Sequence, residues 1–141
     1  MAYTGQCTCG KVKLTVEGDA IQTRQCWCRQ CQKMSGGGPT NNVIFQADAV
    51  RVDGELGSNV YTAASGNQVT WWFCPSCGGQ IQCQTSGRPQ FRVVRLGALD
   101  EPHGLRPQVA IWMEEAPAWA SVDPAMDQFQ RSPPVPAAPN S

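Results

Sequence analysis

The sequence has few charged residues and a single histidine. Only 16% of its 141 residues carry a formal charge, compared with roughly 25% in an average domain, and 11 basic side chains balance 11 acidic ones. Because nucleic-acid binding through bulk charge needs a clustered basic excess, we expect no nucleic-acid partner. The histidine, His103, lies in an acidic, turn-like segment and is expected to be an exposed bystander rather than a metal ligand. A hydrolase of the Ser/His/Asp or Cys/His type is also not expected.

Long apolar runs are absent as well. No run approaches the ~20 residues of a membrane-spanning helix, so we expect no membrane partner. Residues 1–5 have neither the basic start nor the apolar stretch of a secretory signal. We therefore expect a reducing compartment, the cytoplasm, in which disulfides rarely persist. The 41% hydrophobic content is enough to form the core of one ordinary domain.

Cysteine is the residue that the sequence does contain in quantity. Its eight cysteines form three clusters and one isolated position, namely Cys7-x-Cys9, Cys26-x-Cys28-x-x-Cys31, Cys74-x-x-Cys77 and Cys83. A disulfide within Cys-x-Cys would close a strained ring, whereas the two sulfurs can converge on one metal ion. Cys-x-x-Cys on a tight turn is the common half-site of structural zinc. The spacing therefore predicts zinc rather than disulfides, and Cys83 is expected to be a buried strand thiol.

Short segments of alternating apolar and polar residues dominate the chain. Val12, Leu14 and Val16 alternate with polar residues, which is the period of a half-buried strand. Further strands are predicted over residues 43–45, 50–52, 60–61, 69–73, 80–82, 91–96 and 109–113, and short helical pieces over residues 28–34 and 124–129. We therefore predict one mainly β domain over residues 1–130. Residues 131–141 are rich in Pro and Ala and are predicted to form an irregular C-terminal tail.

The cysteine spacing allows two groupings of metal ligands. A closed structural zinc site takes four protein ligands, and a catalytic site keeps three together with an open position. In the first grouping, the first and last cysteine pairs share one metal ion, and the middle cluster is a three-thiolate site with a vacancy. In the second grouping, Cys28 and Cys31 join Cys74 and Cys77 in a ribbon-type site. The spacing alone leaves both groupings open.

Three cysteine motifs and two further segments resemble those of one enzyme family. In chain order, the motifs are Gly5-Gln6-Cys7-Thr8-Cys9-Gly10, Cys26-Trp27-Cys28-Arg29-Gln30-Cys31-Gln32-Lys33-Met34-Ser35-Gly36 and Phe73-Cys74-Pro75-Ser76-Cys77-Gly78. The further segments are Gly97-Ala98-Leu99-Asp100 and Ala116-Pro117-Ala118-Trp119 with a downstream Phe129. Over about residues 3–130, the chain resembles the glutathione-dependent formaldehyde-activating enzyme family, which also includes centromere-protein-V-like members.

This resemblance implies a fold, a ligand assignment and an activity. The implied fold is Mss4-like, a mainly β structure of antiparallel sheets stapled by zinc. Two zinc ions per chain are implied, a structural one held by Cys7, Cys9, Cys74 and Cys77, and a catalytic one held by Cys26, Cys28 and Cys31 with an open position. The implied activity is that of a carbon–sulfur lyase or synthase, which acts on the glutathione–formaldehyde adduct S-hydroxymethylglutathione or on a similar thiol–aldehyde adduct.

Three residues of the middle motif are candidates for substrate contact. Arg29 and Lys33 flank the cysteines and are placed to offset thiolate charge or to hold glutathione carboxylates, and Arg95 on a predicted strand is a further candidate. Trp27 stands where family members often carry histidine, and it either shapes the mouth of the site or packs in the core. An enzyme for a different thiol or small electrophile, and a non-enzymatic zinc-stabilised binding module of the same fold, are the alternative functions. An open position at the middle cluster would favour an enzyme over the binding module.

Overall fold

The computed structural model describes residues 1–137 and forms a mainly β domain, which confirms the fold class expected from the sequence. The strands are β1 (Ala2–Gln6), β2 (Lys13–Glu17), β3 (Gln22–Cys26), β4 (Thr40–Gln46), β5 (Val50–Asp53), β6 (Gly57–Thr62), β7 (Gln68–Phe73), β8 (Gln80–Thr85), β9 (Phe91–Arg95), β10 (Val109–Ile111) and β11 (Asp127–Gln128). The α-helix, α1, spans Arg29–Ser35, and short 3-10 helices span Ala47–Ala49, Leu96–Ala98 and Met113–Glu115. No helix within residues 1–137 is long and apolar enough to cross a membrane.

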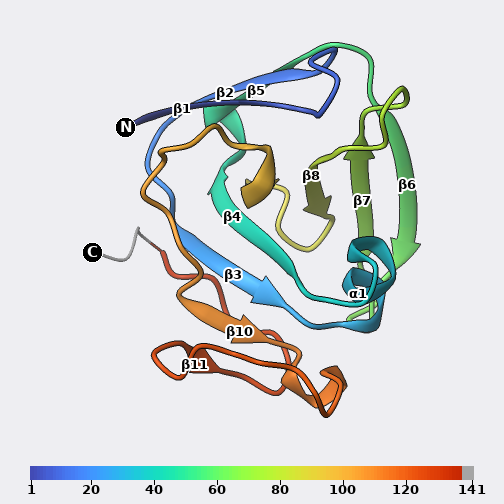
Figure 1. The fold of residues 1–141 in the computed structure, drawn as a ribbon, viewed down its shortest axis with the longest axis vertical. Helices are drawn as coiled ribbons and strands as arrows, with labels where there is room; N and C mark the ends of the chain where they lie inside the picture. The colour runs from blue at the N-terminus through green and yellow to red at the C-terminus, as the bar shows by residue number, and fades with distance from the viewer. Residues whose placement is uncertain (138–141) are drawn as a thin grey trace.

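The strands form two sheets. The smaller sheet has the order β1-β2-β5, and the larger one has the order β11-β10-β3-β4-β9-β8-β7-β6. Neighbouring strands are antiparallel, except that β10 pairs in parallel with β3 and with β11. The larger sheet curves, so that β3 and β10 lie on one side of the molecule and β6 and β7 on the other, with α1 at the end of β3 (Figure 1). This curvature gives the sheet a concave face.

The main core lies where the small sheet packs against β4, β8 and β9. The alternation in β2 buries Leu14 and Val16, as the sequence predicts, and exposes the residues between them. Tyr3 packs on Phe45 with ring centroids 5.5 Å apart. A Cβ at Gly5 would overlap the carbonyl oxygen of Ala98, so glycine is required at this close approach of β1. The small sheet is thereby fixed to the large one.

Strand β3 is not predicted by the sequence, because its residues are almost all polar. It lies inside the large sheet between β4 and β10, and Gln22, Thr23 and Arg24 are all buried. Their polar groups have partners within the fold: Arg24 Nε donates to Gln22 Oε1 at 2.7 Å, and the amide of Thr23 donates to Gln108 Oε1 at 3.0 Å. β3 is therefore a buried polar strand of the large sheet, and it leads directly into the middle cysteine cluster.

The helix predicted over residues 124–129 is wrong. A turn capped by Asp123, whose carboxylate accepts from the amide of Ala125 at 2.9 Å, leads into β11. The amide of Phe129 then donates to the carbonyl of Ala110 at 2.9 Å. Pairing with the edge of β10 satisfies the amide of Phe129, so the segment is extended rather than helical. The helix predicted over residues 28–34 is confirmed as α1.

The described part of the predicted tail is irregular but contacts the domain. Residues 131–137 form no strand or helix. Arg24 donates to the hydroxyl of Ser132 at 3.3 Å and to the carbonyl of Pro134 at 2.8 Å. This segment therefore covers one end of β3, and residues 138–141 of the predicted tail lie outside the described residues.

Candidate metal centres

The first cysteine cluster joins the two sheets. Cys7 and Cys9 lie in the turn after β1, and Cys74 and Cys77 lie in the turn between β7 and β8. Their four sulfur atoms lie within 4.8 Å of one another. Sγ of Cys9 is 3.6 Å from that of Cys7 and 3.7 Å from that of Cys74. These four residues can hold a metal ion, and the ribbon-type grouping is not formed because Cys28 and Cys31 belong to a separate cluster.

The geometry of this cluster fits zinc. A tetrahedral zinc ion with Zn–S bonds near 2.3 Å separates its sulfur ligands by about 3.8 Å, close to the distances found here. The amides of Val12 and Gly79 lie 3.3 Å and 3.4 Å from the sulfurs of Cys7 and Cys77, respectively. Burial opposes ionisation of Cys7, but the Val12 amide and the neighbouring thiols lower the pKa of its thiol to about 6. The same coupling raises the pKa of the Cys9 thiol to about 11, so it is the two amides donating to sulfur that fit metal-bound thiolates here.

The second cluster is formed where β3 meets α1. Cys26 is the last residue of β3, Cys28 is the N-cap of α1, and Cys31 lies in the first turn of the helix. Sγ of Cys28 accepts a hydrogen bond from the backbone amide of Cys31 at 3.4 Å, which caps the helix. The three sulfurs lie within 4.8 Å of one another, and no fourth Cys, His, Asp or Glu of residues 1–137 joins them. These residues can therefore hold a metal ion with three protein thiolates.

The three thiols of this cluster differ in how readily they ionise. Hydrogen bonds from Cys26 and Cys28 lower the pKa of the Cys31 thiol to about 3, and Thr40 and Arg95 act in the same direction. Hydrogen bonding to Cys28 and Cys31, together with burial, raises the pKa of Cys26 well above its usual value. The Cys31 thiol therefore loses its proton more readily than the Cys26 thiol.

The second cluster opens on a cavity of about 250 Å³, which we call the thiol cavity. It lies on the concave face of the large sheet, and the three cysteines line it. Its charged lining residues are Arg24, Arg88 and Arg95, and it has no lining aspartate or glutamate. Burial lowers the pKa of Arg24 to about 10, which still leaves it protonated at neutral pH. The thiol cavity therefore favours an anionic ligand.

Aromatic residues of the β6–β7 hairpin and of the segment after β10 form another wall of the thiol cavity. Tyr61 on β6 and Trp71 on β7 meet edge to face, with ring centroids 4.9 Å apart. Trp112 also lines the cavity and takes a left-handed backbone conformation with φ 59°. Sequence reasoning missed Tyr61 and Trp112 as well as Arg24 and Arg88. The alternation of Val69 with Trp71 along β7 was a usable signal, since both side chains line the cavity.

None of the three predicted substrate contacts, Arg29, Lys33 and Trp27, lines the thiol cavity. Arg29 is exposed and lines a neighbouring groove, which shares Cys28 and Tyr61 with the thiol cavity. Lys33 is exposed one turn further along α1 and does not line the cavity. Trp27 is buried, packs edge to face on Trp119 with centroids 6.4 Å apart, and also does not line it. Of the two roles considered for Trp27, the structure places it in the packed interior.

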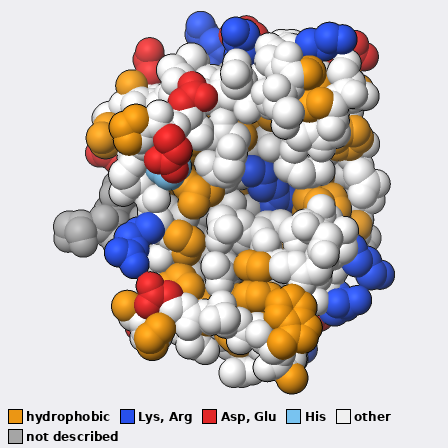
Figure 2. Space-filling view, viewed as in Figure 1, with side chains coloured by type: hydrophobic (Ala, Val, Ile, Leu, Met, Phe, Trp, Pro, Cys, Tyr) orange, Lys and Arg blue, Asp and Glu red, His pale blue; other side chains and the backbone are white. Residues whose placement is uncertain are grey.

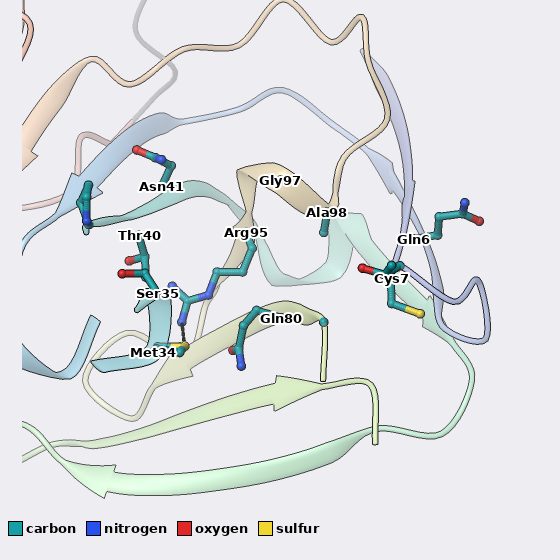
Figure 3. A pocket seen from close by; sticks show the side chains of 13 residues that line it. Gln6, Cys7, Met34, Ser35, Thr40, Asn41, Gln80, Arg95, Gly97 and Ala98 are labelled. Atoms are coloured by element: carbon teal, nitrogen blue, oxygen red, sulfur yellow. Dashed lines mark hydrogen bonds between the residues drawn. The ribbon is translucent and has the colours of Figure 1, made fainter. Parts of the chain in front are cut away.

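Arg95 lies between the thiol cavity and a second cavity of about 310 Å³. The second cavity is bounded by Cys7 and Gln80 on one side and by the end of α1 on the other, and Figure 3 shows the side chain of Arg95 reaching across it towards Met34. On the surface, the face in Figure 2 is hollowed near its middle, with basic side-chain surface inside the hollow. Arg95 is buried, so its guanidinium is an internal feature rather than a solvated surface charge.

His103 and Cys83 both lie outside the two cysteine clusters. The sequence predicts an exposed His103, but the structure buries its side chain. Nε2 meets the Glu101 carboxylate at 2.8 Å, and Nδ1 accepts a hydrogen bond from the amide of Leu105 at 3.0 Å. Cys83 is on β8 and lines the thiol cavity. Burial raises the pKa of the Cys83 thiol.

Comparison with known proteins places this arrangement in a family. A Rhodobacter sphaeroides protein, whose crystal structure was solved as a structural genomics target, has a similar fold with a TM-score of 0.55. It is 24% identical, and the match covers 74% of this chain and 91% of that one. No curated protein matches the sequence. The family model for the glutathione-dependent formaldehyde-activating enzyme matches residues 2–115, which is most of the chain. The chain therefore belongs to the glutathione-dependent formaldehyde-activating enzyme family.

Proposed function

We propose that this chain is a zinc-dependent enzyme that makes and breaks the carbon–sulfur bond between glutathione and formaldehyde, with S-hydroxymethylglutathione as the adduct. Membership of the family supports this activity. The observation that carries the proposal is a cluster of three thiols on a cavity whose charged lining residues are all arginines. We further propose the cytoplasm as the compartment, in line with eight cysteines that are all free thiols.

The two cysteine clusters are proposed to have different roles. Cys7, Cys9, Cys74 and Cys77 supply four thiolates and would close a structural site. Cys26, Cys28 and Cys31 supply three thiolates and would leave one position for a ligand from outside the chain. When bound there, zinc would supply a soft cationic centre that accepts a fourth sulfur and favours its thiolate form. The exchangeable ligand is thus expected at the second cluster only.

The residues around the second cluster support a thiol that carries carboxylates. Arg24 and Arg88 supply positive charge within the cavity, where Arg–carboxylate hydrogen bonds are strong. Arg29 and Lys33 are four residues apart on α1 and so share a helix face, and Arg29 lines the groove beside Cys28. We propose these two as further carboxylate contacts. Trp27 is proposed to support the segment between Cys26 and Cys28 from the side away from the cavity.

The proposed reaction is an addition that needs no redox partner. The sulfur of glutathione forms a bond to the carbon of formaldehyde while the carbon–oxygen π bond breaks. The thiol proton ends on the new hydroxyl oxygen, and the reverse reaction returns it to sulfur. The chain's contribution is to bind the thiol by its anionic groups and to hold its sulfur beside the three cysteines. Tyr61, Trp71 and Trp112 restrict water at this point by lining the cavity.

Adduct formation measured against the spontaneous reaction tests this proposal. Formaldehyde and glutathione are mixed with the zinc-loaded protein, with the Cys31→Ser variant, or without protein, and the adduct is followed by NMR. We expect faster formation only with the wild-type protein. Equal rates in all three samples would favour the alternative, a non-enzymatic zinc-stabilised binding module.

A further inference from the structure

Arg95 is a buried cation without an acidic partner. The residue is 7% exposed, and none of the ion pairs found among residues 1–137 includes it. One Nη donates to Asn42 Oδ1, and the other lies 3.3 Å from the sulfur of Met34, a weak acceptor. Nε is buried and has no partner. A buried charge of this kind is costly unless a counter-charge compensates it.

Among residues 1–137, no carboxylate pairs with Arg95 or lines a cavity with it. Neither of the two cavities that Arg95 lines has a lining aspartate or glutamate. The side chains that share a cavity with it and can become anionic are thiols: those of the second cluster and Cys83 in the thiol cavity, and Cys7 in the second cavity. Met34, which contacts the guanidinium, lies three residues after Cys31 on the same face of α1. The guanidinium is therefore held beside the turn that carries Cys31.

We propose that Arg95 is the built-in counter-ion of the three-thiolate metal site. The inference rests on the proposed zinc site at Cys26, Cys28 and Cys31. Three thiolates on a zinc dication leave a net charge of minus one, and a fourth thiolate makes it minus two. A fixed guanidinium in a poorly solvated position offsets this charge and so strengthens both metal binding and the entry of an anionic sulfur. Arg95 acts through charge and does not contact the reacting atoms.

Zinc affinity measured by competition with a chromogenic chelator tests this role without any reaction. Arg95→Gln removes the charge, and Arg92→Gln is the matched control. Arg92 lies on the same strand, packs over Trp72 at 5.0 Å and lines neither cavity. We expect Arg95→Gln to weaken the weaker-binding zinc at least tenfold, which corresponds to about 1.4 kcal/mol. Arg92→Gln should leave the affinity unchanged, and in both variants the four-cysteine site should keep its zinc.

A second pair of variants covers the case in which Arg95→Gln fails to fold. Met34→Glu places a carboxylate beside the intact guanidinium and neutralises it, whereas Met34→Gln changes shape in the same way without charge. We expect a loss of zinc affinity in Met34→Glu that Met34→Gln does not show. Wild-type affinity in folded Arg95→Gln, or equal affinities in the two Met34 variants, would overturn the role of Arg95. Fewer than two zinc ions in the wild-type protein would instead defeat the proposed metal site itself.

Discussion

The sulfur atoms of Cys9 and Cys74 lie 3.7 Å apart, although the two residues are 65 positions apart in the chain. This contact ties the turn after β1 to the turn between β7 and β8, and therefore ties the small sheet to the large one. The second cluster has a different place, because Cys26, Cys28 and Cys31 are all within six residues of one another. A metal ion at the first cluster would cross-link the fold, and one at the second would not.

Replacing a ligand of each cluster should therefore have different effects on stability. Cys74→Ser should unfold or strongly destabilise the domain, because structural zinc contributes on the order of 10 kcal/mol in small metal domains. Cys31→Ser should leave the domain folded. Thermal melts followed by circular dichroism make the comparison, with Cys83→Ser as the control. The opposite ranking would mean that the structural and catalytic assignments are reversed.

The metal content should follow the same division. We expect two zinc ions per wild-type chain by elemental analysis of protein purified without chelator, and one in Cys31→Ser. Two ions remaining in the Cys31→Ser protein would show that this cysteine is not a required ligand. No zinc in either protein would remove the proposed metal chemistry.

The Cys83 thiol should react with alkylating reagents only slowly at neutral pH. Burial raises its pKa, so that less of it is thiolate at pH 7 than in an ordinary cysteine. Its rate with iodoacetamide should keep rising about tenfold per pH unit past the usual cysteine pKa of about 8.5, where a model peptide levels off. Mass spectrometry of the peptide that contains Cys83 gives the rate. A plateau at the pH of the model peptide would show that the pKa is not raised.

Glutathione affinity should depend on the exposed cations of α1. Arg29→Ala and Lys33→Ala should each weaken binding about tenfold, or about 1.4 kcal/mol, where the lost group pairs with a carboxylate. Lys11→Ala is a suitable control, since Lys11 is an exposed cation that contacts Ser76 near the other cluster. Titration calorimetry measures all three variants. If Arg29→Ala and Lys33→Ala bind like Lys11→Ala, the carboxylates are held elsewhere, with Arg24 and Arg88 as the next candidates.

Most strands could be predicted from the sequence because one face of each is apolar. The alternation of Leu14 and Val16 is an example, since it reports burial on one face of β2. Strand β3 could not be found in this way, because Thr23 and Arg24 are buried through polar contacts made by residues far along the chain. The helix prediction for residues 124–129 was wrong for a related reason, since the pairing of this segment with β10 is a tertiary contact.

The site residues likewise divide into those that the sequence predicts and those that it does not. The cysteines could be found from their spacing, because ligands of one half-site are close in sequence. The partner of each half-site could not, and only the resemblance to a family favoured joining Cys7 and Cys9 to Cys74 and Cys77. The arginines and aromatics of the thiol cavity come from separate strands and connecting segments, so that no local pattern connects Arg24, Tyr61 and Trp112. Folding of the large sheet brings them together.

X-ray absorption at the zinc edge, recorded with and without glutathione, tests the central claim most directly. If Cys26, Cys28 and Cys31 hold a zinc ion with an exchangeable position, glutathione should raise the mean number of sulfur ligands per zinc, and Cys31→Ser should abolish the change. A zinc spectrum of the wild-type protein that is unchanged by saturating glutathione would contradict the account.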